Sequence, residues 1–320
     1  MMHSHRTLLV CSLVVMLAVT LGDRPAFAEA VGTASNPLVI ATSRFHGFLP
    51  AYRVAEKLKD QGIHVKIIEF PSATERLEAV AAGYAHMSYA GLTASILLRA
   101  RGKDVVVVAS TNEKGRGLVA GPEIKNVKML KGKKIGVTFG SIEHITLVAE
   151  LRKNGLDPKK DVQLVNIPSP DQPVAFSNRS IDAYMGFEPW ATYGVKNFGG
   201  KIISYPYDTA VGAVDSGVET SETFIAQYPK LVDAVIKAHI EAVKFYQKNP
   251  EEVIKAGVEN YKVPADIMRI SMHNIELTYR INRKAIEELA RYLVELGFLK
   301  PEELAKIDWN RFINMSYTQG

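Results

Sequence analysis

Two strand-like runs in the middle of the chain end in residues that could hold a ligand. The first run, residues 134–139, ends just before Ser141 and an amphipathic segment, and the second, residues 183–187, leads directly to Trp190. Open α/β sheets bind ligands where strands end and helices begin, because backbone amides and polar side chains meet there. The spacing therefore predicts that both strand ends contribute to one ligand site.

Ser141, Glu143 and His144 fall in the first turn of the helix predicted after the first run. Ser141 fits an N-cap, and the amides that follow it would form a partial anion site; the plainer interpretation is that Ser141 only caps the helix. His144 is placed either to donate to a ligand oxygen or to be a packed or surface histidine. Glu143 suits the positive end of the helix dipole, but as a site residue it would repel a bare anion and favour a ligand with an amino or amide group.

Further candidates follow other predicted strands. Trp190 would stack on a ligand or wall it off, and Glu188 would accept a hydrogen bond, although a core tryptophan and a first-turn glutamate explain the same pattern. Gly91 ends an apolar run in the first half of the chain. Thr93 then offers its amide and hydroxyl.

Arg44 and Phe45 follow the first predicted strand. Phe45 would add an aromatic wall, and Arg44 would pair with a sulfonate or carboxylate unless it is an ordinary solvated arginine. Asn112 and Asp215 lie near expected crossings between two halves of the protein and complete the set of candidates.

Patterns typical of catalysis are missing. The sequence has no Gly-x-Ser-x-Gly elbow, His-Glu-x-x-His motif, phosphate-binding P-loop or Gly-x-Gly-x-x-Gly motif after a strand. We therefore predict a binding protein without catalytic residues, metal or cofactor.

The first 28 residues predict a signal peptide. Arg6 lies in a polar start, residues 7–21 are apolar but short for a membrane span, and Ala26-Phe27-Ala28 fits a peptidase site. An uncleaved anchor is the alternative. We expect export to the periplasm with cleavage near Ala28.

Composition excludes several functions. The single cysteine, Cys11, lies within the predicted signal, so the mature chain would have no disulfide, thiolate metal site or cysteine nucleophile. The net charge of +5 is spread along the chain without long basic runs, which argues against nucleic-acid binding. We expect a monomer.

The order of patterns predicts an α/β fold. Apolar runs alternate with helical patterns up to about residue 204, which is typical of mainly parallel sheets with helices on both faces. The runs are residues 38–41, 65–68, 87–90, 105–109, 134–139, 162–167 and 183–187, with helices at 50–60 and 73–82. After Val218 the patterns indicate helices alone, including 224–247 and 286–296.

A faint internal repeat supports two similar halves. Phe70-Pro71-Ser72 and Ile167-Pro168-Ser169 each precede a predicted helix and then an apolar strand. Two such halves facing each other would enclose a cleft.

Between residues 37 and 297 the chain carries several motifs in a fixed order, namely Lys131-Gly132-Lys133-Lys134-Ile135-Gly136-Val137, Gly140-Ser141 with His144, Asp182-Ala183, Glu188-Pro189-Trp190, Tyr228-Pro229 and Asn249-Pro250. In this order they resemble periplasmic substrate-binding proteins of ABC transporters, in the group that handles sulfonates, taurine, nitrate and thiamine-pyrimidine precursors.

The resemblance implies a type II periplasmic binding fold, the two-lobe Venus flytrap. Residues 29–117 and 214–320 would form the first lobe with a C-terminal helical extension, and residues 118–213 the second. The resemblance also implies a small-molecule ligand delivered to a transmembrane permease with a cytoplasmic ATPase. Family ligand contacts would fall on Ser141, His144 and Trp190, and around Phe45 and residues 91–93.

Three residues depart from the group's pattern. His86 stands where an acidic residue is common, Arg179 where glycine is common, and Glu143 in the anion-binding turn itself. The last departure argues against a simple oxyanion such as nitrate.

We therefore expect the solute-binding component of an ABC import system for a small polar organic solute, with alkanesulfonate or taurine the best candidate. The alternatives are a binder of nitrate or bicarbonate, a binder of a thiamine-pyrimidine or other heteroaromatic precursor, a pyrimidine-synthesising enzyme, and a binding protein that presents its ligand to a sensor. The related enzymes are cytosolic and use a cysteine-rich segment, which this chain lacks.

Overall fold

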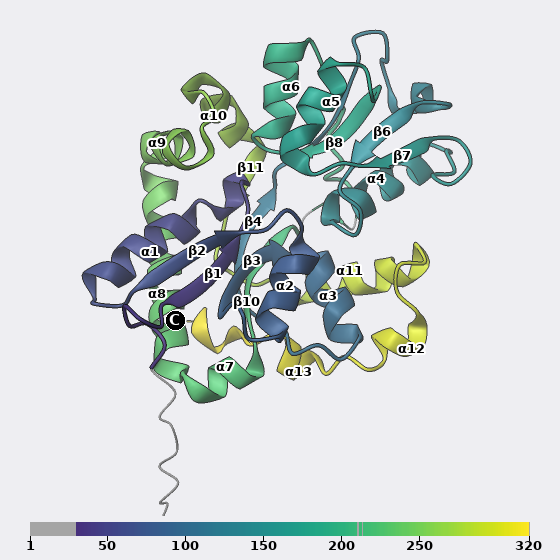
Figure 1. The fold of residues 1–320 in the computed structure, drawn as a ribbon. Helices are drawn as coiled ribbons and strands as arrows, with labels where there is room; N and C mark the ends of the chain where they lie inside the picture. Colours follow the sequence, from purple (N-terminus) through teal and green to yellow (C-terminus); the bar gives the residue numbers. More distant parts are fainter. Residues whose placement is uncertain (1–29, 210, 213, 320) are drawn as a thin grey trace, which may run out of the picture.

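The computed structural model describes residues 30–209, 211–212 and 214–319. They form two β-sheets, each with helices on both sides, connected by two passages of the chain (Figure 1). The predicted signal peptide lies outside the described residues.

The first sheet has the strand order β11-β4-β10-β3-β1-β2. Its strands are β1 (Leu38–Thr42), β2 (Val65–Glu69), β3 (Met87–Gly91), β4 (Val106–Lys114), β10 (Ser216–Thr220) and β11 (Ile275–Leu277). Strand β1 pairs in parallel with β2 and β3, whereas β10 is antiparallel to both β3 and β4.

The second sheet has the order β7-β6-β8-β5-β9. Its strands are β5 (Arg116–Ala120), β6 (Lys134–Val137), β7 (Gln163–Asn166), β8 (Ala183–Phe187) and β9 (Lys201–Ser204). Strand β6 is parallel to β7 and β8, and β5 is antiparallel to β8 and β9. The parallel prediction thus holds within β1–β3 and within β6–β8, and antiparallel strands join each sheet where the chain passes between them.

Helices cover both faces of each sheet. They are α1 (Pro50–Asp60), α2 (Ala73–Ala81), α3 (Leu92–Ala100), α4 (Ile142–Lys153), α5 (Gln172–Ser177), α6 (Trp190–Phe198), α7 (Glu222–Gln227), α8 (Pro229–Lys248), α9 (Pro250–Tyr261), α10 (Ala265–Ser271), α11 (Arg283–Glu295), α12 (Pro301–Leu304) and α13 (Trp309–Phe312).

The first sheet is buried on both sides, which explains its continuous apolar runs. Leu38 and Ile40 of β1 pack with residues of α1 and α8 in one apolar cluster, and Ala41, directly after Ile40, packs with Val80 of α2 in another. Burying an aliphatic side chain of this size contributes roughly 1.5–3 kcal/mol.

Two expectations about the C-terminal part were wrong. The segment predicted as one helix at residues 224–247 is two helices, because Pro229 has no amide hydrogen and Tyr228 before it leaves the helical region. The segment after Val218 is also not helical throughout, since β11 pairs with the end of β4. Strand β11 has only three residues, which are too few to show the alternation of a strand in the sequence.

The chain passes from the first sheet to the second at Lys114 and Gly115, which both have a positive φ, of 62° and 87°. It returns between β9 and β10. The hydroxyl of Tyr207, in the returning segment, accepts hydrogen bonds from the amides of Gly115 and Arg116, each at 3.0 Å. One side chain therefore ties the two passages together.

The C-terminal helices contact both parts of the molecule. Helix α10 packs against α6 of the second sheet, and Trp190 and Tyr193 of α6 join an apolar cluster around Tyr261 and Met268. Within the described residues, no helix is long and apolar enough to cross a membrane.

Candidate ligand-binding site

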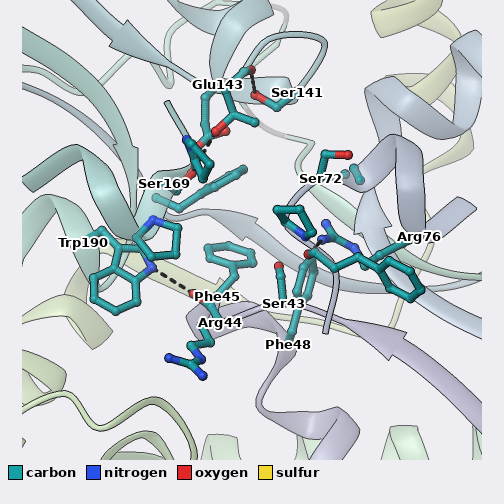
Figure 2. Close-up of a pocket in the computed structure, with 18 of the residues that line it drawn as sticks. Ser43, Arg44, Phe45, Phe48, Ser72, Arg76, Ser141, Glu143, Ser169 and Trp190 are labelled. Atoms are coloured by element: carbon teal, nitrogen blue, oxygen red, sulfur yellow. Dashed lines mark hydrogen bonds between the residues drawn. The ribbon is translucent and has the colours of Figure 1, made fainter. Parts of the chain in front are cut away.

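A cavity of about 350 Å³ lies where the strand ends of the two sheets meet. Its lining comes from both: the loop after β1, the start of α2 and Gly91 on one side, and the start of α4, the Pro168–Asp171 loop, Phe187 and Trp190 on the other. In Figure 2, Arg76 and Ser72 lie on the right of the pocket, Glu143 and Ser141 at the top and Trp190 on the left, with Phe45 between Trp190 and Arg76.

Aromatic rings form a continuous wall. The Phe45 ring lies 4.5 Å from the Phe187 ring, centroid to centroid, and 4.8 Å from the Phe48 ring, which meets it edge-on. Phe45 follows β1 and Phe187 ends β8, so the wall spans the two sheets. Such a wall suits the apolar body of an organic ligand.

Arg76 is a buried cation in the cavity lining, with only 4% of its surface exposed. Helix α2 begins at a Ser72–Glu75 capping box, and Arg76 follows in the first turn. Its Nη1 donates to the Phe70 carbonyl at 2.9 Å, while its buried Nε has no hydrogen-bond partner. Burial lowers the pKa of Arg76 to about 10, so the guanidinium stays charged at neutral pH.

No ion pair within the described part of the chain involves Arg76. Glu219, a buried carboxyl that accepts from Ser95 at 2.9 Å, is nearby, but burial raises its pKa to about 8. At neutral pH this carboxyl therefore carries little charge to offset the guanidinium. An anion in the cavity would supply the missing partner.

Glu143 is a buried carboxyl on the other side of the cavity from Arg76. Helix α4 is capped by Ser141, whose Oγ accepts from the His144 amide at 3.3 Å. Glu143, two residues after Ser141, is 1% exposed and accepts a hydrogen bond from the Ser169 hydroxyl. Burial raises the pKa of Glu143 to about 7, against the opposing effect of the Ser169 and Ser141 hydroxyls.

Trp190 closes one end of the cavity and links the two sheets. Its indole Nε1 donates to the carbonyl of Arg44 at 2.9 Å. The Arg44 guanidinium turns outward and pairs with Glu69 at 3.0 Å, with about half of its side chain exposed. Arg44 therefore lines the cavity as one member of a half-exposed ion pair, which is closer to the ordinary solvated arginine than to the anion-binding residue of the two sequence interpretations.

Six of the predicted site residues line the cavity: Arg44, Phe45, Gly91, Ser141, Glu143 and Trp190. Five are placed elsewhere, namely Thr93, Asn112, His144, Glu188 and Asp215. Thr93 points into the protein, where its Oγ1 is buried without a partner. Asn112 accepts from the Thr111 hydroxyl at 2.7 Å inside β4.

The other three are held by local contacts. His144 accepts from the Gly140 amide at 3.2 Å and lies between Phe139 and Phe298, with ring distances of 4.9 and 5.2 Å. Burial lowers the pKa of His144. Glu188 accepts from the Thr192 amide at 3.1 Å and the Asn274 amide group at 2.7 Å, so it caps α6.

Asp215 lies directly behind the cavity in a fully buried ion pair. Its Oδ2 is 2.6 Å from Nη1 of Arg116, and Arg116 also donates to the Val211 carbonyl at 3.2 Å. The carbonyl of Asp215 accepts from the Leu92 amide at 2.9 Å, which occupies one of the amides at the start of α3. Asp215 thus fixes the passage between the sheets beside the site.

Sequence reasoning missed Arg76, Ser72 and Ser169 as lining residues. The internal repeat carried the signal for the two serines, because both Pro-Ser pairs lie in the cavity wall before α2 and α5. Arg76 also had a signal: a cation in the first turn of a helix opposes the helix dipole. Within the described ranges, no group of three His, Cys, Asp or Glu side chains is arranged to hold a metal ion.

Comparison with known proteins gives consistent results. Residues 33–258 match the model of the NMT1-like family. The taurine-binding periplasmic protein of Escherichia coli (strain K12) is 26% identical over 281 residues, which cover 82% of this chain and 86% of that protein.

Two solved structures show the same fold at low identity. The alkanesulfonate-binding protein from Xanthomonas axonopodis pv. citri, bound to MOPS, superposes with a TM-score of 0.75 at 18% identity, covering 88% of this chain and 98% of that one. The periplasmic nitrate-binding protein from Synechocystis PCC 6803 has a TM-score of 0.77 at 14% identity, covering 87% and 86%.

Proposed function

Because this chain belongs to the NMT1-like family and has the fold of periplasmic binding proteins, we propose that it is the solute-binding component of an ABC import system. It captures a small organic anion in the cavity between the sheets, with an alkanesulfonate or taurine as the preferred class. It works in the periplasm and delivers this ligand to a membrane permease driven by a cytoplasmic ATPase.

The observation that carries this proposal is the guanidinium of Arg76, which is buried beside an aromatic wall and has an unsatisfied Nε and no ion-pair partner among the described residues. A planar guanidinium offers a fork of donors that matches the oxygens of a sulfonate or carboxylate. Phe45, Phe48 and Phe187 then contact the organic part. An ion as small as nitrate would leave most of this cavity of about 350 Å³ empty.

We assign residues 29–117 and 214–320 to one lobe and residues 118–213 to the other. The passages at Lys114–Arg116 and after β9 fit these boundaries to within a few residues. The ligand would contact Arg76 in the first lobe and Glu143 and Trp190 in the second. Ligand binding would then favour the closed arrangement, because only that arrangement supplies both sets of contacts.

A thermal-shift screen followed by isothermal titration tests the proposal. Ligands would be straight-chain alkanesulfonates, taurine, nitrate, bicarbonate and an aminopyrimidine. A true ligand at a thousandfold excess over its Kd stabilises the protein by about 4 kcal/mol. Binding of pyrimidine or nitrate with no response to any sulfonate would contradict the sulfonate assignment.

Arg76→Gln provides the matching variant. Removing a charged hydrogen-bond donor costs about 1.5–3 kcal/mol, so sulfonate affinity should fall roughly tenfold to a hundredfold. Arg101→Gln, at an exposed arginine just after α3, is the control and should leave the affinity unchanged. Equal affinities for the two variants would remove Arg76 from the site.

A further inference from the structure

We propose that the site selects a dipolar solute, with the anionic end of the ligand on Arg76 and a cationic end, such as an ammonium group, on Glu143. This inference rests on the proposed function and names the subclass of ligand and its orientation. It places the anion at the start of α2, and not at the partial anion site that the sequence offered as one interpretation of the start of α4.

The start of α2 has two independent sources of positive potential. Arg76 faces the cavity without an ion-pair partner among the described residues, and its Nε is unsatisfied although the side chain is 96% buried. Ser72 and Ala73, the N-cap and first residue of this nine-residue helix, also line the cavity, so the positive end of the helix dipole points there. A cation in this turn destabilises the helix unless an anion binds beside it.

The start of α4 is different because Glu143 occupies it. The carboxyl lines the cavity and accepts from the Ser169 hydroxyl, but no cationic side chain of the described chain pairs with it. A carboxyl has room for further donors beyond one hydroxyl. An anionic ligand group placed here would meet a carboxyl instead of a cation.

The charges behind Glu143 favour a cation in front of it. Asp215 and Arg116 act on the Glu143 carboxyl from behind, and they neutralise each other in a contact of 2.6 Å. Ionised Glu143 therefore gives this group of three a net negative charge, which Arg76 on the other side of the cavity offsets only through space, since no ion pair among the described residues joins the two. A ligand ammonium group balances it without disturbing the buried pair.

The remaining charged groups in the lining do not offer an alternative. Arg44 and Glu69 pair with each other at 3.0 Å, and Tyr52 also donates to Glu69 at 2.9 Å. Asp171 is exposed at the edge of the site. Among the described residues, the two buried charged groups of the lining without an ion-pair partner are thus Arg76, from the first sheet's side, and Glu143, from the second.

Matched ligand pairs test the inference by isothermal titration at pH 7.5. One pair is taurine and ethanesulfonate, and the other is 4-(aminomethyl)benzenesulfonate and 4-methylbenzenesulfonate, so that each pair differs mainly by one ammonium group. The ammonium member of at least one pair should bind ten times more tightly or better. In Glu143→Gln this advantage should fall to about twofold or less. Glu150→Gln, a buried carboxyl on the same helix that accepts from Ser204 and does not line the cavity, should keep the native ratio.

A pH series on the native protein gives a second readout that needs no variant. The affinity ratio within the responsive pair should rise from pH 5.5 to pH 8, because Glu143 ionises while the ligand amine and Arg76 stay protonated. Ratios near one in both pairs at every pH would overturn the dipolar inference and leave the sulfonate proposal intact. Failure of all four sulfonates to bind would overturn both.

Discussion

Glu143 illustrates how a single side chain serves both a helix and a site. An acidic residue in the first turn of α4 stabilises the helix through the dipole, and this alone would explain it. Its burial argues for more, because an exposed glutamate would give the same dipole interaction without losing its hydration. Burial raises the pKa of Glu143 to about 7, so the protein holds a carboxyl that ionises near neutral pH.

This shift predicts a pH-dependent stability in the absence of ligand. The folded-state pKa of about 7 lies above the unfolded value of about 4.3. Below about pH 4 the Glu143 carboxyl is protonated in both the folded and the unfolded state, so the free energy of unfolding does not change with pH through this group. As the pH rises towards 7, the carboxyl loses its proton in the unfolded state first, so the free energy of unfolding falls. Between pH 5 and pH 8 this should lower the free energy of unfolding of the native protein by about 2.5 kcal/mol relative to Glu143→Gln.

Urea unfolding at the two pH values measures this difference. Glu219 also has a raised pKa, but it is present in both proteins and cancels in the comparison. If the free energy of unfolding changes by the same amount between pH 5 and pH 8 in the native protein and in Glu143→Gln, the Glu143 carboxyl of the folded protein is already ionised, or well hydrated, at pH 5.

At the residue scale, the sequence predicted the loops of the site better than the direction of each side chain. Ser141, Glu143 and Trp190 follow strand ends and lie in the cavity wall as expected. His144 is one residue beyond Glu143, and its ring stacks on Phe139 outside the cavity. The strand and helix pattern does not distinguish these neighbours, because a turn of 100° per residue decides which side chain faces the ligand.

At the element scale, parallel strands and long helices were predictable, and strands near the passages were not. β1, β2, β3 and β8 are apolar runs between turn residues, so their pattern is clear. β9 and β11 have only four and three residues, and β10 (Ser-Gly-Val-Glu-Thr) has a single large apolar side chain. Their pairing is set by distant partners, which a local pattern does not contain.

The turn between α5 and β8 gives a prediction of its own. Arg179 has a φ of 63°, in the left-handed region that favours glycine, and its side chain is exposed. Relief of this strain is worth about 1–2 kcal/mol, and the extra freedom of glycine in the unfolded chain costs about 0.5–1 kcal/mol. Arg179→Gly should therefore stabilise the protein by about 0.5 kcal/mol in urea unfolding.

The neighbouring Asn178 is the control. Its φ is −88°, which any residue adopts, and its Oδ1 accepts from the Ser180 amide at 3.0 Å and the Ser180 hydroxyl at 2.6 Å, so Asn178→Gly should destabilise the protein by about 1 kcal/mol or more. Destabilisation by Arg179→Gly of the same size as Asn178→Gly would mean that Arg179 makes a favourable contact in this turn.

At the scale of the whole molecule, the site depends on contacts that join the two sheets. Tyr207 ties the two passages, Arg116 and Asp215 form a buried pair between them, and Trp190 bonds to the loop after β1. Removing one member of a buried pair such as Arg116–Asp215 typically costs 3–5 kcal/mol, because the other charge remains buried. The passages are therefore held firmly, whereas the hydrogen bond of Trp190 lies beside the cavity, where a bound ligand can alter it.

Fluorescence tests this role of Trp190, because the chain has only two tryptophans. Trp309 lies in α13, in the apolar cluster around α11, and does not line the cavity. Trp309→Phe leaves Trp190 as the single emitter, and its emission should change as ligand fills the cavity beside it.

In Trp190→Phe the ring stacking remains, but the hydrogen bond to the Arg44 carbonyl is lost. A neutral hydrogen bond contributes about 0.5–1.5 kcal/mol, so the ligand affinity should fall roughly twofold to tenfold while the fluorescence response disappears. If Trp309→Phe binds ligand calorimetrically with unchanged emission, or if Trp190→Phe keeps the full response, Trp190 does not form the wall of the occupied site.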